Sequence, residues 1–191
     1  MTGSDPYRYP GRSVLQNSLG LTDSDQLAQA ERRLVGQRIA EGVPTGRFDL
    51  ARLRAIHRHL FQDLYAWAGE LRTVEIAKGG HQFQFRHFIE RGVADIHQRL
   101  VQAAFLRGLS SNAFAEAAGT IIGDVNYVHP FRDGNGRTQL QYLKQLAAQA
   151  NHPIALTRIE PSRWLDASRS AHDGDHEPMA AAIERALVGR D

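Results

Sequence analysis

The stretch HPFRDGNGRTQ, residues 129–139, gathers side chains of the kinds that carry out chemistry. Pro130 disfavours the α region for the residue before it, so we expect a helix to end at about residue 128 and His129 to open a loop. The imidazole of a histidine has an unperturbed pKa of about 6.5 and can take a proton near neutral pH. His129 is therefore a candidate general base.

A candidate anion site follows directly in the sequence. The glycine-bounded residues 134–136 open a new helical pattern, where free backbone N–H groups and the helix dipole both favour an anion. Asn135 can donate a further hydrogen bond, and Arg137 can bind phosphate through its planar fork of donors. Asp133 would repel a bare phosphate but suits Mg²⁺ lying between carboxylate and phosphates. The stretch thus predicts a metal-bound nucleotide and a phosphoryl or nucleotidyl transfer that His129 starts by deprotonating a hydroxyl.

Each of these residues taken alone also has a structural interpretation. A single histidine beside a helix is more often a structural hydrogen-bonding residue than a base, and glycine-rich turns are common. The order of residues does not match the phosphate loop that ends in Gly-Lys-Ser/Thr. Nor does it match the dinucleotide fingerprint, which should follow a strand. The combination therefore indicates a more specific signature.

The elements that must position this stretch are mostly helices. Apolar residues at steps of three and four predict helices over residues 24–40, 49–68, 87–106, 111–128 and 136–150. Side chains alternate only over residues 71–85, around Lys78, Gly79 and Gly80, which is typical of a β-hairpin. The sequence thus predicts a mainly α-helical domain with one small hairpin. Because a lone two-stranded ribbon is marginally stable, the hairpin must pack on the helices or serve binding.

Composition sets the remaining bounds. The 191 residues are enough for one domain with a sizeable core, so we expect a single domain over residues 1–191. A net charge of +2 gives no basic field for nucleic acid, and the lack of cysteine excludes disulfides, thiolate metal sites and a cysteine nucleophile. The sequence shows no apolar run of signal-peptide or membrane-span type. We therefore expect a cytoplasmic protein without direct nucleic-acid or membrane contact.

The stretch HPFRDGNGR resembles the signature of the Fic family, His-x-Phe-x-Asp/Glu-Gly-Asn-Gly-Arg, and matches every specified position. DPYRYPG near the N-terminus, WAGELRTVEIAKGG and the final helical stretch are similar to the branch of bacterial toxins and type-IV-secreted effectors, so the resemblance covers nearly the whole chain. Most family members transfer AMP from ATP to hydroxyl side chains of proteins. The resemblance implies a Fic-type helical domain and a protein adenylyltransferase, toxin-like or secreted as an effector.

The resemblance also implies a role for each residue of the loop. It makes His129 the base for a Ser, Thr or Tyr hydroxyl, places Phe131 in the core, and puts Asp133 on Mg²⁺. The residues that would bind the phosphates of ATP are Gly134, Asn135, Gly136 and Arg137. In the family the hairpin is a flap that binds the extended backbone of the target by strand addition. The flap residues would include Ile76, Lys78, Gly79 and Gly80.

One position departs from the longer family pattern, Gly-Arg-x-x-Arg. The second arginine, which in the family helps to hold the terminal phosphates and pairs with an inhibitory glutamate, falls at Leu140. Leu140 also fits the apolar stripe of its helix, and Lys144 lies one turn further along. Two alternatives therefore stay open. One is an enzyme of the same fold that transfers another phosphate-containing group, and the other is a catalytically weak nucleotide-binding or interaction protein.

The resemblance also bears on regulation. Members that inhibit themselves carry a Ser/Thr-x-x-x-Glu-Gly/Asn helix, whereas the one Glu-Gly pair in this sequence, Glu41 and Gly42, has Gln37 in place of the Ser or Thr. We therefore expect a small helical antitoxin that supplies the glutamate and docks against the predicted N-terminal helices.

The remaining histidines give weaker signals. His57 and His59 are two residues apart on a predicted helix, so they point apart and form no metal-binding pair. His172 and His176 in HDGDHE could bind a metal, but a polar loop before the last helix is the simpler interpretation.

Overall fold

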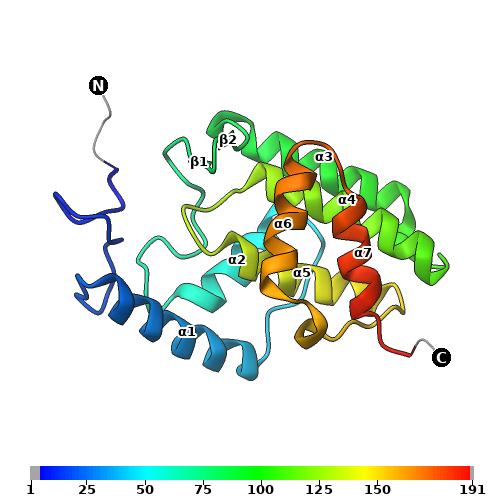
Figure 1. Cartoon of the computed structure of the whole chain (residues 1–191), viewed down its shortest axis with the longest axis horizontal. Helices are drawn as coiled ribbons and strands as arrows, with labels where there is room; N and C mark the ends of the chain where they lie inside the picture. The colour runs from blue at the N-terminus through cyan, green and yellow to red at the C-terminus, as the bar shows by residue number, and fades with distance from the viewer. Residues whose placement is uncertain (1–4, 190–191) are drawn as a thin grey trace.

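The computed structural model describes residues 5–189, and most of them lie in helices (Figure 1). The helices are α1 (Ser24–Glu41), α2 (Leu50–Phe61), α3 (Ile89–Gln102), α4 (Ser111–Val128), α5 (Asn135–Gln149), α6 (Pro161–His172) and α7 (Glu177–Ala186). Two short strands, β1 (Ala77–Lys78) and β2 (His81–Gln82), pair antiparallel. The mainly α-helical prediction is confirmed. In the described part of the chain, no helix combines the length and apolar character that crossing a membrane requires.

The helix predicted over residues 49–68 is shorter in the structure and ends at Phe61. Leu64 and Tyr65 are buried in the turn that follows, and the Tyr65 ring stacks on Trp67 with centroids 4.4 Å apart. The apolar spacing that predicted a helix beyond Phe61 therefore comes from buried residues of a turn. Apolar side chains can reach the core without continuing a helix. The helix predicted over residues 87–106 is likewise shorter. It ends at Gln102, because residues 104–106 adopt positive φ angles.

The hairpin forms where the alternation predicts it, but its strands have only two residues each. Gly79 and Gly80 have φ angles of 59° and 86°, which a tight hairpin turn of this type requires. Ala77 pairs with Gln82 and Lys78 with His81. At the tip, the His81 ring nitrogen Nδ1 lies 3.2 Å from the Asp173 carboxylate, in the loop between α6 and α7. The flap is thus a short ribbon that contacts the C-terminal helices.

Helix α4 is the centre of the domain and contacts α3, α5, α6 and α7. Two glycines let α7 and the turn before it approach α4 closely. A Cβ added at Gly119 would lie 2.8 Å from the Ala180 backbone nitrogen, and one at Gly123 would lie 2.3 Å from the His176 ring. These glycines lower helix propensity but permit the close contact. On the other side, α2 packs against α1 and α5 and supports the loop before α5, whereas β1 and β2 lie towards the end of α6 (Figure 1).

The close contact predicts the effect of adding a methyl group. Gly119→Ala should lower the free energy of unfolding by about 1–3 kcal/mol, because the new Cβ would overlap the Ala180 backbone. Gly36→Ala in α1 is the matched control, since nothing lies within 4 Å of its added Cβ. Because alanine has a higher helix propensity than glycine, Gly36→Ala should stabilise the protein by up to about 1 kcal/mol. Urea denaturation measures both changes, and equal destabilisation by the two would contradict the explanation.

Candidate active site

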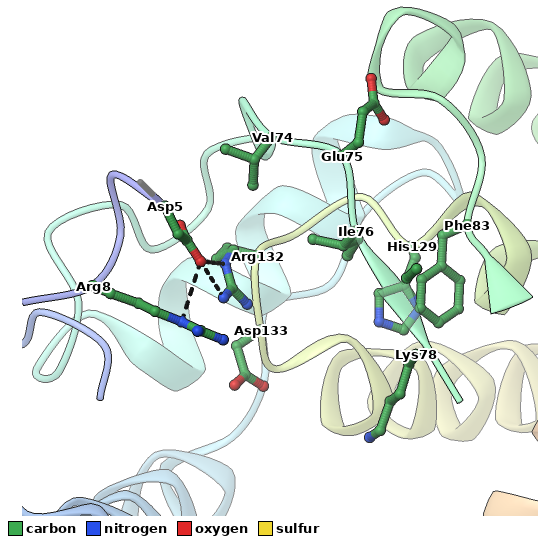
Figure 2. A pocket seen from close by; sticks show the side chains of 11 residues that line it. Asp5, Arg8, Val74, Glu75, Ile76, Lys78, Phe83, His129, Arg132 and Asp133 are labelled. Atoms are coloured by element: carbon green, nitrogen blue, oxygen red, sulfur yellow. Dashed lines mark hydrogen bonds and ion pairs between the residues drawn. The ribbon is translucent and has the colours of Figure 1, made fainter. Parts of the chain in front are cut away.

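A cavity of about 410 Å³ lies between the loop after α4, the flap and the N-terminal segment (Figure 2). This volume is within the range of small-molecule sites. Its lining consists of residues 74–78, Phe83, His129, Arg132, Asp133, Asp5 and Arg8. The structure therefore brings four predicted site residues to one cavity, namely His129, Asp133, Ile76 and Lys78.

His129 ends α4 in the left-handed conformation, with φ 46° and ψ 62°. Its Nδ1 lies 3.0 Å from the Asn126 carbonyl oxygen. Because a carbonyl only accepts, Nδ1 carries the proton and Nε2 is the unprotonated nitrogen of the neutral ring. The ring stacks on Phe83 with centroids 3.7 Å apart. Burial lowers the pKa of His129 to about 4, although the hydrogen bond to Asn126 acts in the opposite direction. The ring is thus neutral around pH 7, and the same burial makes it a weaker base than a free imidazole.

Phe131 and Asn135 hold the loop between His129 and α5. The Phe131 ring is fully buried, as predicted, and stacks on His57 with centroids 4.0 Å apart. The Asn135 amide accepts a hydrogen bond from the Phe131 N–H (3.0 Å) and donates one to the Phe131 carbonyl (2.8 Å). The Asn135 side chain therefore braces the loop. Because the side chain is engaged in this way, the group of Asn135 that is available to an anion is its backbone N–H.

His57 supports the same loop from α2. Its Nδ1 accepts from the Gly69 N–H (2.8 Å), so its Nε2 donates to the Asp133 carbonyl (3.0 Å). Burial lowers the pKa of this ring to about 4. Next to it, Gly134 has φ 77°, and an added Cβ would lie 2.5 Å from the Phe61 ring. A glycine is therefore required where α5 begins.

The start of α5 offers an anion site. The first helical hydrogen bond is from the Thr138 N–H to the Gly134 carbonyl (3.1 Å), so the N–H groups of residues 135–137 have no partner within the helix. Asp133 precedes them with a half-exposed carboxylate that accepts from the Gly134 N–H (2.5 Å). Within residues 5–189, no cluster of three or more His, Asp or Glu could hold a metal ion. A single carboxylate still suits Mg²⁺, which takes its other ligands from phosphates and water.

The Arg137 side chain is held in an internal ion pair. Its guanidinium contacts the Glu31 carboxylate of α1 and lies 4.7 Å above the centre of the Phe61 ring. Glu31 also accepts a hydrogen bond from the Tyr65 hydroxyl (2.8 Å). Arg137 is not among the residues that line the cavity, although its guanidinium lies 3.9 Å from the Asp133 carboxylate. Phosphates that reach Arg137 must therefore share it with Glu31 or displace Glu31.

The comparison with known proteins agrees with this geometry. A family model described as Fic/DOC family matches residues 47–147, which is more than half of the chain. The chain belongs to the Fic/DOC family. The region matched begins just before α2 and ends within α5, so it contains the flap and the whole active-site loop.

Relatives and solved structures extend the Fic similarity over nearly the whole chain. The chain is 39% identical to the probable protein adenylyltransferase y4lH of Sinorhizobium fredii, over 96% of each chain. It is 38% identical to the protein adenylyltransferase VbhT of Bartonella schoenbuchensis, over 97% of this chain but 39% of VbhT. The crystal structure of the effector BepC from Bartonella tribocorum with bound AMPPNP superposes with a TM-score of 0.87, at 25% identity and 97% coverage of both chains.

Several residues of this Fic site were missed by sequence reasoning. The Arg132 guanidinium donates to the Asp5 carboxylate (3.0 Å), and Arg8 lies 3.3 Å from the same carboxylate, so the N-terminal segment is tied to the loop (Figure 2). Arg72 is buried and donates to the His129 carbonyl (2.8 Å). Arg72 could have been noticed in the sequence as a charged residue within the alternating segment. Nothing in the sequence distinguishes Glu31 from other charged residues on a helix.

Leu140, which replaces the second Fic arginine, is half-buried and packs against the hydrophobic core. Its neighbours Tyr142 and Leu143 are buried, and Lys144 is exposed. These positions support the interpretation of Leu140 as part of the apolar stripe of α5.

The buried His57 predicts how stability depends on pH. Its pKa is about 4 in the fold and 6.5 ordinarily, so the unfolded chain binds more protons between these values. The free energy of unfolding should be highest above a pH of about 6.5 and fall as the pH drops towards about 4, by roughly 3 kcal/mol from His57. His57→Gln keeps a donor and an acceptor without titrating. The His57→Gln variant should be less stable than the parent at neutral pH. Its free energy of unfolding, measured by urea titration, should depend less steeply on pH. An unchanged slope would argue against this role.

Proposed function

We propose that the protein is a protein adenylyltransferase that transfers AMP from ATP to a Ser, Thr or Tyr hydroxyl of a target protein. The observation that carries this proposal is the neutral His129, whose Nε2 is unprotonated beside the anion site at the start of α5. The relative y4lH, 39% identical over 96% of each chain, is named a probable protein adenylyltransferase. BepC, with the same fold, was crystallised with the ATP analogue AMPPNP.

The residues of the site suit each step of such a transfer. The Nε2 of His129 takes the proton of the target hydroxyl while the hydroxyl oxygen attacks the α-phosphorus. The bond from the α-phosphorus to the bridging oxygen of the β-phosphate breaks, and pyrophosphate leaves. The N–H groups of residues 135–137 stabilise the negative charge on the phosphates. Arg137 contributes a charged donor once the phosphates compete with Glu31 for it.

Mg²⁺ is the proposed cofactor, and Asp133 is its proposed ligand. The carboxylate is half-exposed and lies at the cavity, where a nucleotide could supply further oxygen ligands. Bound there, Mg²⁺ would offset the charge of the phosphates. Lys78 lies at the cavity and would favour an anionic ligand, whereas the charges of Arg8 and Arg132 are offset there by Asp5.

The flap is the proposed docking site for the target. Residues 74–78, which include β1, line the cavity, and β1 pairs only with β2 among the described residues, so its other edge is free. An extended target segment can add to that edge through backbone hydrogen bonds. Ile76 and Lys78 would contact it, with Gly79 and Gly80 forming the turn. A side chain projecting from the added strand would then face His129.

We also propose a regulatory partner. The sequence lacks the helix motif of self-inhibiting members, so a small helical antitoxin would supply the inhibitory glutamate and dock against α1 and α2. The enzyme would then act as a toxin in the bacterial cytoplasm. Action in a host cell after secretion is the second possibility, because BepC is described as a VirB-translocated effector.

The proposal predicts the effect of removing the base. His129→Ala should lower transfer roughly 10²- to 10⁴-fold while ATP binding is kept, because the base acts on the target hydroxyl. Label from ATP should reach protein from the α position and not from the γ position. His59→Ala, on α2 outside the cavity, is the control and should keep transfer. Label from the γ position would favour phosphoryl transfer, and ATP binding without any labelling would favour a nucleotide-binding protein.

A second prediction concerns the flap. Ile76→Pro removes a backbone donor that an added strand needs, so transfer to a protein target should fall more than the affinity for ATP. Ile76→Val keeps the N–H and should retain transfer. Steady-state kinetics with the target and ATP varied separately distinguishes the two effects. Full transfer by Ile76→Pro would show that the target docks elsewhere.

A further inference from the structure

Arg72 is a buried charged residue that takes no part in the steps above. Its side chain is 0% exposed. Its Nε donates to the His129 carbonyl at 2.8 Å, and its terminal nitrogens donate to the carbonyls of Val74 (2.9 Å), Gln84 and Val128 (3.4 Å). These acceptors belong to two different parts of the active site.

The first part is the active-site loop. Three consecutive residues, Val128, His129 and Pro130, each offer a carbonyl to Arg72, the last one to its backbone N–H (2.9 Å). The second part is the flap, where Val74 lies on the limb that leads into β1 and Gln84 on the limb that leaves β2. One residue thus ties both limbs of the flap to the residue that carries the base.

The ion pair of Arg72 is a weak reason for an arginine at this position. Burial lowers the pKa of the guanidinium, and its carboxylate partner, Glu75, lies 3.3 Å away and is 38% exposed. An apolar side chain of similar volume would avoid the desolvation of a charge but would leave the carbonyls that Arg72 binds without a donor. A guanidinium, however, holds five N–H donors in one plane and can reach several carbonyls at once, whereas a lysine offers three donors on a single atom.

The position of His129 makes this link relevant to the reaction. The left-handed conformation is unfavourable for a residue with a Cβ, so the backbone of His129 must be held by its surroundings. The bond from Arg72 fixes its carbonyl, while the bonds to Val74 and Gln84 fix the base of the flap. Arg72 therefore helps to set the distance from the free edge of β1 to the His129 ring, together with the Phe83 ring stacked on His129 and the bond from the Gln84 N–H to the Tyr127 carbonyl (3.0 Å).

We propose that Arg72 is a positioning residue for the transfer, which holds the flap and His129 at the separation that brings a hydroxyl of a flap-bound strand to Nε2. This inference rests on the proposed adenylyl transfer. It assigns to the alternating segment a function in the geometry of the reaction, in addition to docking of the target.

Arg72→Lys tests the proposal because it keeps the charge and loses the planar set of donors. With a protein target, kcat should fall about 100-fold, the effect of a reacting group misplaced by about 1 Å. The KM for ATP should be unchanged, because Arg72 binds the carbonyls of residues 128–130, whereas the proposed metal- and phosphate-binding groups belong to residues 133–137. Arg52→Lys is the matched control, since Arg52 is also buried but its polar partners are Gln145 (2.8 Å) and Gly46, outside the flap and the loop. It should cost comparable stability and leave kcat unchanged.

Hydrogen exchange of the flap gives a reading that does not depend on activity. The amides of residues 76–83 should exchange faster in Arg72→Lys than in the parent and should be unchanged in Arg52→Lys. Glu75→Gln serves as a second variant if Arg72→Lys does not fold, and should change kcat and exchange in the same direction by less. Equal effects of Arg72→Lys and Arg52→Lys on kcat, or unchanged flap exchange, would overturn the proposal. If the parent transfers no AMP, the proposed function fails, and the exchange comparison still decides whether Arg72 couples flap and loop.

Discussion

The candidate active site depends on the burial of Phe131 at the centre of its loop. The ring is fully buried against His57, and the Asn135 side chain binds both the N–H and the carbonyl of the same residue. Because the middle of the loop is fixed in this way, His129 before it and Asp133 after it take positions set by the hydrophobic core. The groups proposed to carry the chemistry are therefore held by the same aromatic cluster that stabilises the domain.

The loop could be predicted from the sequence because its residues are contiguous, so their proximity is guaranteed by the chain. The residues that support it could not. Arg72 meets His129 across 57 residues of sequence, and His57 meets Asp133 across 76. A single sequence does not record such pairs, since each partner also has an ordinary local explanation, such as an alternating strand for Arg72 and a helix face for His57.

The errors in the element boundaries have a related cause. Leu64 and Tyr65 continue the apolar spacing of α2 although they lie in a turn, because periodicity reports which side chains are buried and not which carbonyls accept hydrogen bonds. The alternation over residues 71–85 likewise extends beyond the two-residue strands, since both limbs of the flap bind Arg72 in place of a strand partner. At Leu140, the apolar stripe of α5 was the correct guide to packing.

The shortness of β1 limits the affinity that the proposed docking mode can supply. An edge of two residues offers about two or three backbone hydrogen bonds, each contributing about 0.5–1.5 kcal/mol net. Ordering each residue of a flexible peptide costs about 1–2 kcal/mol, so these terms nearly cancel. A target segment that is already extended in its own fold loses less entropy on binding. The flap would thus favour target proteins whose docking segment is already ordered in an extended conformation. Because the backbone contacts contribute little net affinity, the modified product would also dissociate readily.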